Sequence, residues 1–193
     1  MDEMRELKRQ LRREYKKRAG ELSEVYRREA DRKILETILS SHSWQCASGV
    51  FVYVSMGAEP DTRALIRSAL TAGKRVYVPL CCPEWVMRAV RIQSFDELRP
   101  GLRGIPEPPA EAADAGPGEL SLAIVPCVTV TASGLRLGHG GGYYDRFLCR
   151  RDCEALCLCY AEMLAESLPE EPWDVRMDGV LTEKGYLRCQ SER

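Results

Sequence analysis

The chain has 193 residues, a formal net charge of −1 and 45% hydrophobic residues, values that are ordinary for a globular protein. The balanced charge indicates no general preference for nucleic acid, and no apolar run is long enough to span a bilayer. The opening residues 1–8 lack the apolar stretch of a signal peptide. We therefore expect a cytoplasmic protein with a single domain over residues 1–193, without nucleic-acid or membrane partners.

The first half of the chain alternates helical patterns with short apolar runs. Apolar residues recur every three or four positions in the first segment, beside a basic stripe, and Gly20 ends this pattern. Ser23 and Asp61 are suited to capping the two helices that follow. The expected elements are helices over 3–20, 23–41 and 62–72 and strands over 49–55, 75–80 and 85–92.

The second half continues the alternation. We expect strands over 121–130, 155–160 and 178–182 and a helix from about 142 to 149. Strands that alternate with helices predict a three-layer α/β/α sandwich with a mostly parallel sheet. A segment rich in Pro and Gly, 100–118, is typical of a long functional or mobile loop.

Nine cysteines are the unusual feature of the composition. Their odd number and the lack of a secretory signal argue against a disulfide framework. No Cys-x-x-Cys pair occurs, and Cys157 and Cys159 are spaced as on one face of a strand. We expect mainly buried thiols that pack as small apolar side chains, with metal or redox chemistry as the alternative.

The densest cluster of chemical signals lies at 134–145. Five glycines occur within 134–142, after a predicted strand and before a predicted helix. Glycine lets backbone amides approach an anion closely, and a helix N-terminus adds partial positive charge, so the loop is suited to phosphate. The spacing matches neither the dinucleotide-binding nor the P-loop pattern, and a tight strand-to-helix turn explains the glycines equally well.

Side chains in and beside this loop favour the phosphate interpretation. Arg136 can pair bidentately with phosphate oxygens, and Asp145 is a hard oxygen ligand that suits Mg²⁺. Tyr143 and Tyr144 offer hydroxyls and faces for stacking, and His139 is one of only two histidines.

The run Gly-x-Arg-Leu-Gly-x-Gly-Gly-Gly-Tyr-Tyr-Asp-Arg-Phe-Leu at 134–148 resembles the signature of the 5-formyltetrahydrofolate cyclo-ligases, also called methenyltetrahydrofolate synthetases. The similarity covers most of the chain and includes, in order, residues 8–12, 53–59, 73–79, 104–108 and 173–182. It implies a fold shared with sugar-phosphate isomerases and CoA-transferases.

The resemblance also implies a reaction. In it, 5-formyltetrahydrofolate is cyclised to 5,10-methenyltetrahydrofolate with ATP and Mg²⁺, and ADP and phosphate are released. Phosphorylation turns the formyl oxygen, a poor leaving group, into a good one, so that the N10 amine can attack the activated carbon. Such an enzyme works mainly by alignment and by neutralising phosphate charge. The implied partner is a small folate, with or without a polyglutamate tail, and the implied state is a monomer.

The resemblance finally assigns roles to individual residues. The implied catalytic residues are Arg136, Tyr144 and Asp145, and the implied Mg²⁺ ligands are Asp145 and Asp174. The implied folate contacts are Val54, Glu59, Gly140, Gly141, Gly142, Tyr143 and Tyr144. The implied ATP contacts are Lys8, Arg12, Arg136, Leu137, Gly138, His139, Gly140, Gly141, Gly142, Tyr143 and Tyr144.

Each charged assignment has a structural alternative. Lys8 and Arg12 lie one helical turn apart, and such pairs commonly form a solvated basic face. Asp145 is an acid that a helix N-terminus favours in any case, Asp174 fits a surface turn, and Glu59 fits a loop before proline.

The chain departs from the family pattern at two places, and three other functions compete with the cyclo-ligase prediction. The family often has Phe-Asp where this chain has Val130-Thr131, and Tyr or Arg where it has His139. The competing functions are an isomerase or CoA-transferase relative, a non-catalytic nucleotide-binding regulator, and RNA binding through the basic first helix.

Overall fold

The computed structural model describes residues 2–101 and 104–189. Its helices are α1 (Asp2–Glu21), α2 (Glu24–Ser40), α3 (His42–Cys46), α4 (Arg63–Thr71) and α5 (Tyr143–Leu148). Its strands are β1 (Gly49–Val52), β2 (Arg75–Cys81), β3 (Met87–Ile92), β4 (Arg99–Pro100), β5 (Pro106–Glu107), β6 (Leu122–Val125), β7 (Thr129–Val130), β8 (Arg136–Leu137), β9 (Glu154–Leu158), β10 (Gly179–Thr182) and β11 (Gly185–Arg188).

Seven of these strands form one sheet, in the order β11-β10-β9-β6-β1-β2-β3. The five inner strands run parallel, and the two edge strands, β3 and β11, run antiparallel to their neighbours. The prediction of a mostly parallel sheet is therefore confirmed. The carboxyl ends of β1, β6 and β9 meet at one edge, which is where parallel sheets of this type place ligands.

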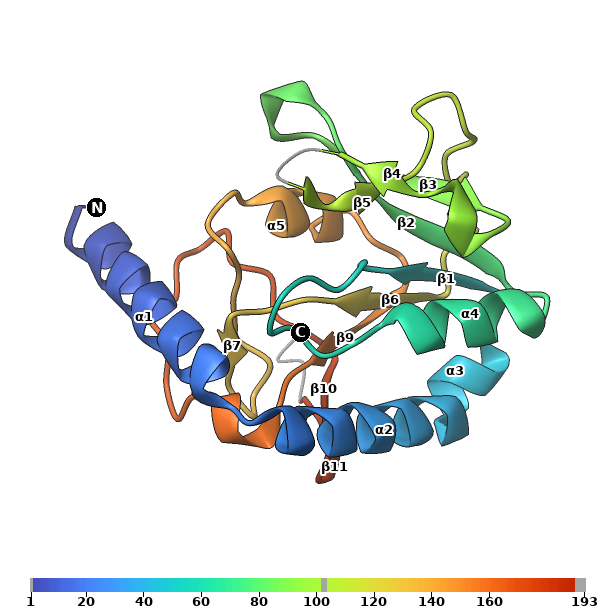
Figure 1. Cartoon of the computed structure of the whole chain (residues 1–193). Helices are drawn as coiled ribbons and strands as arrows, with labels where there is room; N and C mark the ends of the chain where they lie inside the picture. The colour runs from blue at the N-terminus through green and yellow to red at the C-terminus, as the bar shows by residue number, and fades with distance from the viewer. Residues whose placement is uncertain (1, 102–103, 190–193) are drawn as a thin grey trace.

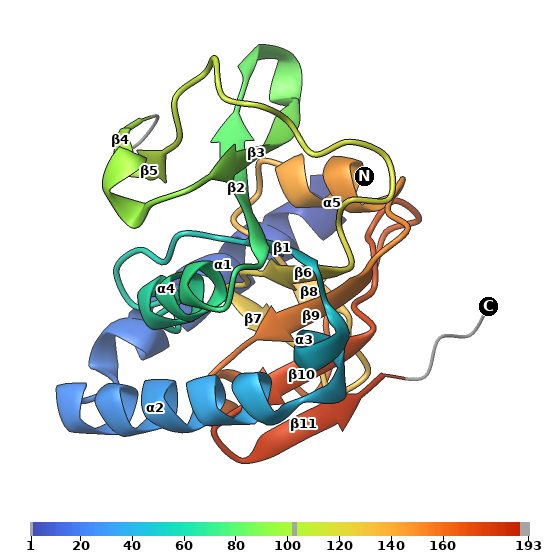
Figure 2. The ribbon, with the colours of Figure 1, turned by 90° about the vertical axis from the view of Figure 1, so that its right-hand side faces the viewer.

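Helices cover both faces of the sheet, as predicted (Figure 2). On one face α2 and α4 contact β10 and β2. On the other face α5 packs through Phe147, whose ring lies 4.8 Å from that of Phe51 in β1. Because the inner strands are buried on both faces, their sequences are almost continuously apolar, as in β6 with Leu-Ala-Ile-Val.

The first helix, α1, crosses the edge of the sheet toward which β1 and β6 point (Figure 1). Tyr15 buries its ring against the core, and Arg18 donates to the backbone oxygen of Glu162, just beyond β9. This position of α1 brings its basic stripe to the carboxyl edge of the sheet. Among the described residues, no helix is both long and apolar enough to cross a membrane.

Several boundaries differ from expectation for local reasons. The strand predicted over 85–92 begins only at Met87, since Glu84 and Trp85 have positive φ and form the tip of the β2–β3 hairpin. The strand predicted over 121–130 is interrupted by Pro126, which has no amide to donate, and its end forms β7. Asp61 accepts from the amide of Arg63, although the helix itself begins one residue later than predicted.

The segment 100–118 is more ordered than a free loop. Strand β4, which begins one residue before it, pairs with β5 inside it, and the amide of Ala115 donates to Ala89 in β3 at 2.8 Å. The amide of Arg91 likewise donates to Ala113 at 2.8 Å, so the segment is attached to the outer edge of the sheet. Residues 102–103 lie outside the described residues.

Candidate active site

The glycine loop connects β8 to α5 and contacts three arginine side chains, those of Arg12, Arg136 and Arg146. A Cβ at Gly138 would lie 2.6 Å from the Nη1 atom of Arg136, so any other residue there would displace that guanidinium group. Gly140 has φ +100, and a Cβ there would lie 3.4 Å from the guanidinium carbon of Arg12. Arg12 also donates from Nε to the carbonyl of Gly138 at 2.7 Å. The glycines therefore allow guanidinium groups to pack directly on the loop backbone.

Arg136 is the buried cation of this region, with 2% of its side chain exposed. Its Nη2 atom lies 2.8 Å from Oδ1 of Asp145, and its guanidinium carbon lies 5.6 Å from the centre of the Tyr144 ring. Its buried Nε has no hydrogen-bond partner among the described residues. A buried donor without an acceptor is costly, so this group is suited to an incoming anion. Burial, and then Glu59, raise the pKa of Tyr144, whose hydroxyl therefore stays protonated.

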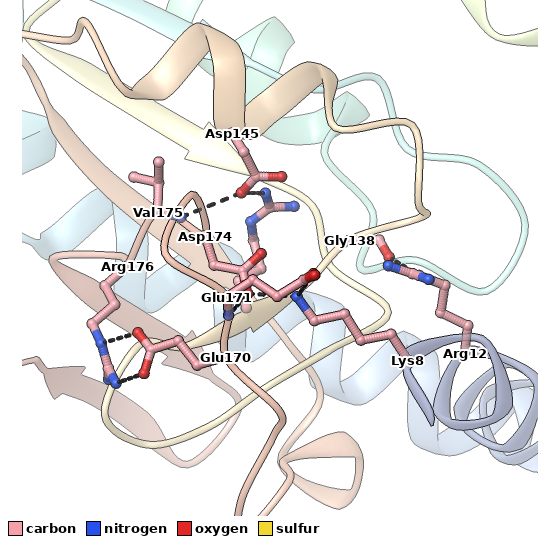
Figure 3. A network of polar contacts seen from close by, with 10 residues as sticks. Lys8, Arg12, Gly138, Asp145, Glu170, Glu171, Asp174, Val175 and Arg176 are labelled. Atoms are coloured by element: carbon pink, nitrogen blue, oxygen red, sulfur yellow. Dashed lines mark hydrogen bonds and ion pairs between the residues drawn. The ribbon is translucent and has the colours of Figure 1, made fainter. Parts of the chain in front are cut away.

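A second ion-pair group lies beside the first and joins α1 to the segment before β10 (Figure 3). Nζ of Lys8 lies 2.8 Å from Glu171 and 2.5 Å from Asp174, and all three side chains are largely buried. Burial lowers the pKa of Arg12, while the carboxylates of Asp174, Glu171 and Asp145 oppose that shift. We call the six residues the charged cluster: Lys8, Arg12, Arg136, Asp145, Glu171 and Asp174.

An apolar cavity of about 230 Å³ lies next to the charged cluster; we call it the edge cavity. It is lined by residues of α1, by the loop after β1 and by the segments that follow β6 and β9. Glu59 and His139 lie at its wall, with Nε2 of His139 2.9 Å from Oε1 of Glu59. The other oxygen of Glu59 accepts from the amide of Met56 at 2.8 Å. One glycine-loop residue therefore joins the two halves of the site.

Comparisons with known proteins agree with this geometry. Residues 4–183 match the model of the 5-formyltetrahydrofolate cyclo-ligase family. The chain belongs to the 5-formyltetrahydrofolate cyclo-ligase family. It is 35% identical to the 5-formyltetrahydrofolate cyclo-ligase of Escherichia coli over 142 residues, covering 70% of this chain and 78% of that one. It is 29% identical to the enzyme of Haemophilus influenzae, covering 89% and 95% of the two chains.

A solved structure of a relative has the same fold. The 5,10-methenyltetrahydrofolate synthetase of Aquifex aeolicus superposes with a TM-score of 0.84 at 30% identity, covering 97% of this chain and 95% of that one. The reaction of this cyclo-ligase family is the ATP-dependent cyclisation of 5-formyltetrahydrofolate. These matches favour the cyclo-ligase prediction over the isomerase, transferase, regulator and RNA-binding alternatives.

Within this cyclo-ligase-family chain, the predicted phosphate and metal residues are brought together from three segments. The solvated-face alternative is wrong for Lys8, whose side chain is 7% exposed, and the surface-turn alternative is wrong for Asp174, at 13%. Asp145 is in the first turn of α5, as the helix-terminus alternative predicts, and it also pairs with Arg136. Its role as a Mg²⁺ ligand stays a prediction. Sequence reasoning missed Glu171, for which the only signal was the acidic pair before Pro172.

The structure does not bring all of the predicted folate residues to one place. Glu59 lines the edge cavity, whereas Val54 is buried in the core and is not among the lining residues. Tyr143 points to the β2–β3 hairpin, where its hydroxyl donates to Cys82 at 3.4 Å and its ring lies 5.7 Å from that of Trp85. The sequence contained no sign that this hairpin contacts the glycine loop, because residues 85–92 were predicted to form a regular strand.

Proposed function

We propose that this chain cyclises 5-formyltetrahydrofolate to 5,10-methenyltetrahydrofolate, with ATP bound at the charged cluster and the folate in the edge cavity. The contact between His139 and Glu59 at 2.9 Å carries the proposal. It links the glycine loop to the cavity wall, so a phosphate on the loop and a folate in the cavity would be neighbours. Phosphoryl transfer requires this adjacency above all.

On the nucleotide side, the cations of the charged cluster would bind the phosphates. Lys8 and Arg136 already pair with carboxylates, and Arg12 donates to the carbonyl of Gly138, so phosphate oxygens would replace or share those partners. The buried Nε of Arg136, which has no hydrogen-bond partner among the described residues, would gain one from a phosphate oxygen that reached it. Fixed, largely buried donors stabilise charge that develops on a transferring group more strongly than water does.

On the folate side, the cavity offers apolar walls and one carboxylate. Glu59 would accept hydrogen bonds from N–H donors of the pterin, while the walls remove its ring from water. The formyl oxygen would then attack the terminal phosphorus of ATP, and ADP would leave. Attack of N10 on the activated carbon closes the ring, and the former formyl oxygen leaves with phosphate. The protonated hydroxyl of Tyr144 is a hydrogen-bond donor beside this path.

The acids of the cluster fit a magnesium ion that arrives with the nucleotide. In the described part of the chain, hydrogen bonds use only Oδ1 of Asp145 and Oδ2 of Asp174. No group of three or more His, Cys, Asp or Glu suited to a metal occurs among the described residues. Mg²⁺ is commonly held by one or two carboxylates plus phosphates, and it would neutralise phosphate charge here. Asp145 and Asp174 would be its protein ligands.

A direct assay tests the proposal. Purified protein is mixed with 5-formyltetrahydrofolate, ATP and Mg²⁺, and the near-ultraviolet absorbance of the methenyl product is followed. We expect product to form only when all three are present, with one ADP released per product. Folded protein that forms no product under these conditions would refute the proposed function.

A further inference from the structure

Three buried cysteines lie close together at the edge cavity, and two of them, Cys127 and Cys159, line its wall. Cys157 and Cys159 occupy one face of β9 and its extension, and Cys157 is in register with Val125 of β6. Continuing this register by two residues on each segment brings Cys127 to the level of Cys159, and both residues line the same cavity. The thiols of Cys127 and Cys157 both point at the carbonyl oxygen of Leu158, at 3.4 and 3.9 Å.

The three thiols are not equivalent. Hydrogen bonding from Cys157 and Cys159 lowers the pKa of Cys127 well below its ordinary value, and the guanidinium of Arg136 adds to this against the effect of burial. Burial raises the pKa of Cys157, and hydrogen bonding to Cys127 together with burial raises that of Cys159. Of the three thiols, Cys127 therefore ionises most readily, and the thiolate is the form of a cysteine that reacts as a nucleophile.

Small molecules have a route to this cluster. Cys127 and Cys159 both line the edge cavity, although their residues are only 8% and 2% exposed. The other buried cysteines, Cys153, Cys157 and Cys189, do not line it. Cys46 and Cys149 are exposed at the outer surface and provide an internal reference for ordinary thiol reactivity.

We propose that Cys127 is a modification site for small peroxides that enter the edge cavity, and that Cys159 is its resolving thiol. The Cys127 thiolate attacks a peroxide oxygen, the O–O bond breaks, and a sulfenic acid forms as water or an alcohol leaves. The sulfur of Cys159 then attacks the sulfenic sulfur, the S–S bond forms, and the hydroxyl leaves as water. The two thiols lose two electrons in total, and the peroxide gains them.

The consequence for ligand binding rests on the proposed function. A disulfide between Cys127 and Cys159 would fix the wall of the cavity in which the folate is proposed to bind. The oxidised protein would therefore lose substrate binding, and a dithiol reductant would restore it. Conversely, bound folate would cover Cys127 and slow its oxidation.

Peptide mapping tests the site without relying on activity. The full chain is treated with hydrogen peroxide, free thiols are blocked with an alkylating agent, and the protein is digested with trypsin. We expect a cross-link between the peptide 104–136, which carries Cys127, and the peptide 152–176. The cross-link should vanish in Cys127→Ala and Cys159→Ser and persist in Cys153→Ala and Cys157→Ala. At a folate concentration about 100 times its Kd, it should form about 100-fold more slowly.

The outcomes separate the two proposals. No cross-link at peroxide doses that oxidise Cys46 would overturn the modification site, as would a cross-link that depends on Cys157 instead of Cys159. A cross-link that forms as expected but is not slowed by folate would leave the modification site intact. That result would instead contradict the placement of folate in the edge cavity.

Discussion

The charged cluster and the edge cavity lie side by side at the carboxyl edge of the sheet, yet they are built on opposite principles. In the cluster, Lys8 and Arg136 already hold carboxylates at 2.5 to 2.8 Å, so a ligand must exchange partners with them. The cavity is lined mainly by apolar groups and needs only to remove a ring from water. Substitutions that remove a charge from the charged cluster should therefore weaken mainly the use of the nucleotide. Substitutions at the cavity should weaken mainly the binding of folate.

The largest effect is expected from Asp145→Asn. The amide oxygen can still accept from Arg136, so the fold should persist, but the neutral amide is a weaker ligand for a divalent cation and cannot balance the guanidinium charge. We expect kcat for cyclisation to fall by about 10²–10³, the loss typical of one electrostatic group in an active site. Steady-state kinetics at varied ATP and Mg²⁺, with thermal unfolding of the same samples, measure this.

Asp178→Asn is the matched control. Asp178 pairs with Arg151 at 2.7 Å, but both residues precede strands and so lie at the opposite edge of the sheet. We expect this variant to keep its kcat. Equal losses in the two variants would mean that Asp145 acts through general stability.

The second prediction concerns the cavity. Glu59→Gln keeps the size of the side chain but replaces a carboxylate oxygen by an amide group, which is a poorer match for N–H donors of a pterin. We expect the Kd for 5-formyltetrahydrofolate to rise about tenfold, or about 1.4 kcal/mol, with little change for ATP. Calorimetric titration of each ligand measures both. A larger rise in the Kd for ATP than in the Kd for folate would contradict the assignment of Glu59 to the folate side.

Much of this site could be predicted from the sequence because its signals are local. The glycine spacing before Tyr143 indicated a strand–loop–helix unit, and the periodicity of 3–20 indicated the basic helix. Both were confirmed, since neighbouring residues alone determine such patterns. The alternation of strands and helices likewise predicted a mostly parallel sheet.

What the sequence did not reveal depends on distant pairing or on weak patterns. Lys8 meets Glu171 across 163 positions, and no local pattern records such a contact. Strand β11 is short, with three of its four residues exposed, so it lacks the apolar alternation by which strands are recognised. The expectation of mainly buried thiols holds for Cys127 and Cys157 but is wrong for Cys46 and Cys149, because spacing does not encode depth.

The third prediction tests the junction between the two regions. His139→Ala removes the contact to Glu59 while leaving the phosphate cations in place. If this contact links the sites, each ligand should enhance the binding of the other less in the variant. We expect this coupling to fall by about 0.5–1 kcal/mol, the range of an exposed pair, and equally whichever ligand is added first. An unchanged coupling, measured by titrating a non-hydrolysable ATP analogue with and without folate, would show that His139 only borders the cavity.

The last substitution, Asp61→Asn, acts on stability rather than on a ligand contact and tests the scaffold beneath the cavity wall. Burial alone would raise the pKa of Asp61, but hydrogen bonds from Arg63 and Ser55 outweigh it and hold that pKa below its ordinary value. The carboxylate therefore adds stability that is fully present above about pH 4 and is lost as pH falls through the lowered pKa. We expect Asp61→Asn to reduce the free energy of unfolding by about 1 kcal/mol at pH 7 and by less at pH 3. Urea unfolding at both pH values measures this; equal losses at the two would mean that the charge of Asp61 contributes nothing. Ser55 and Asp61 flank the loop that carries Glu59. If Asp61→Asn reduces the binding free energy of folate by more than it reduces the free energy of unfolding, Asp61 also sets the position of Glu59 for folate binding.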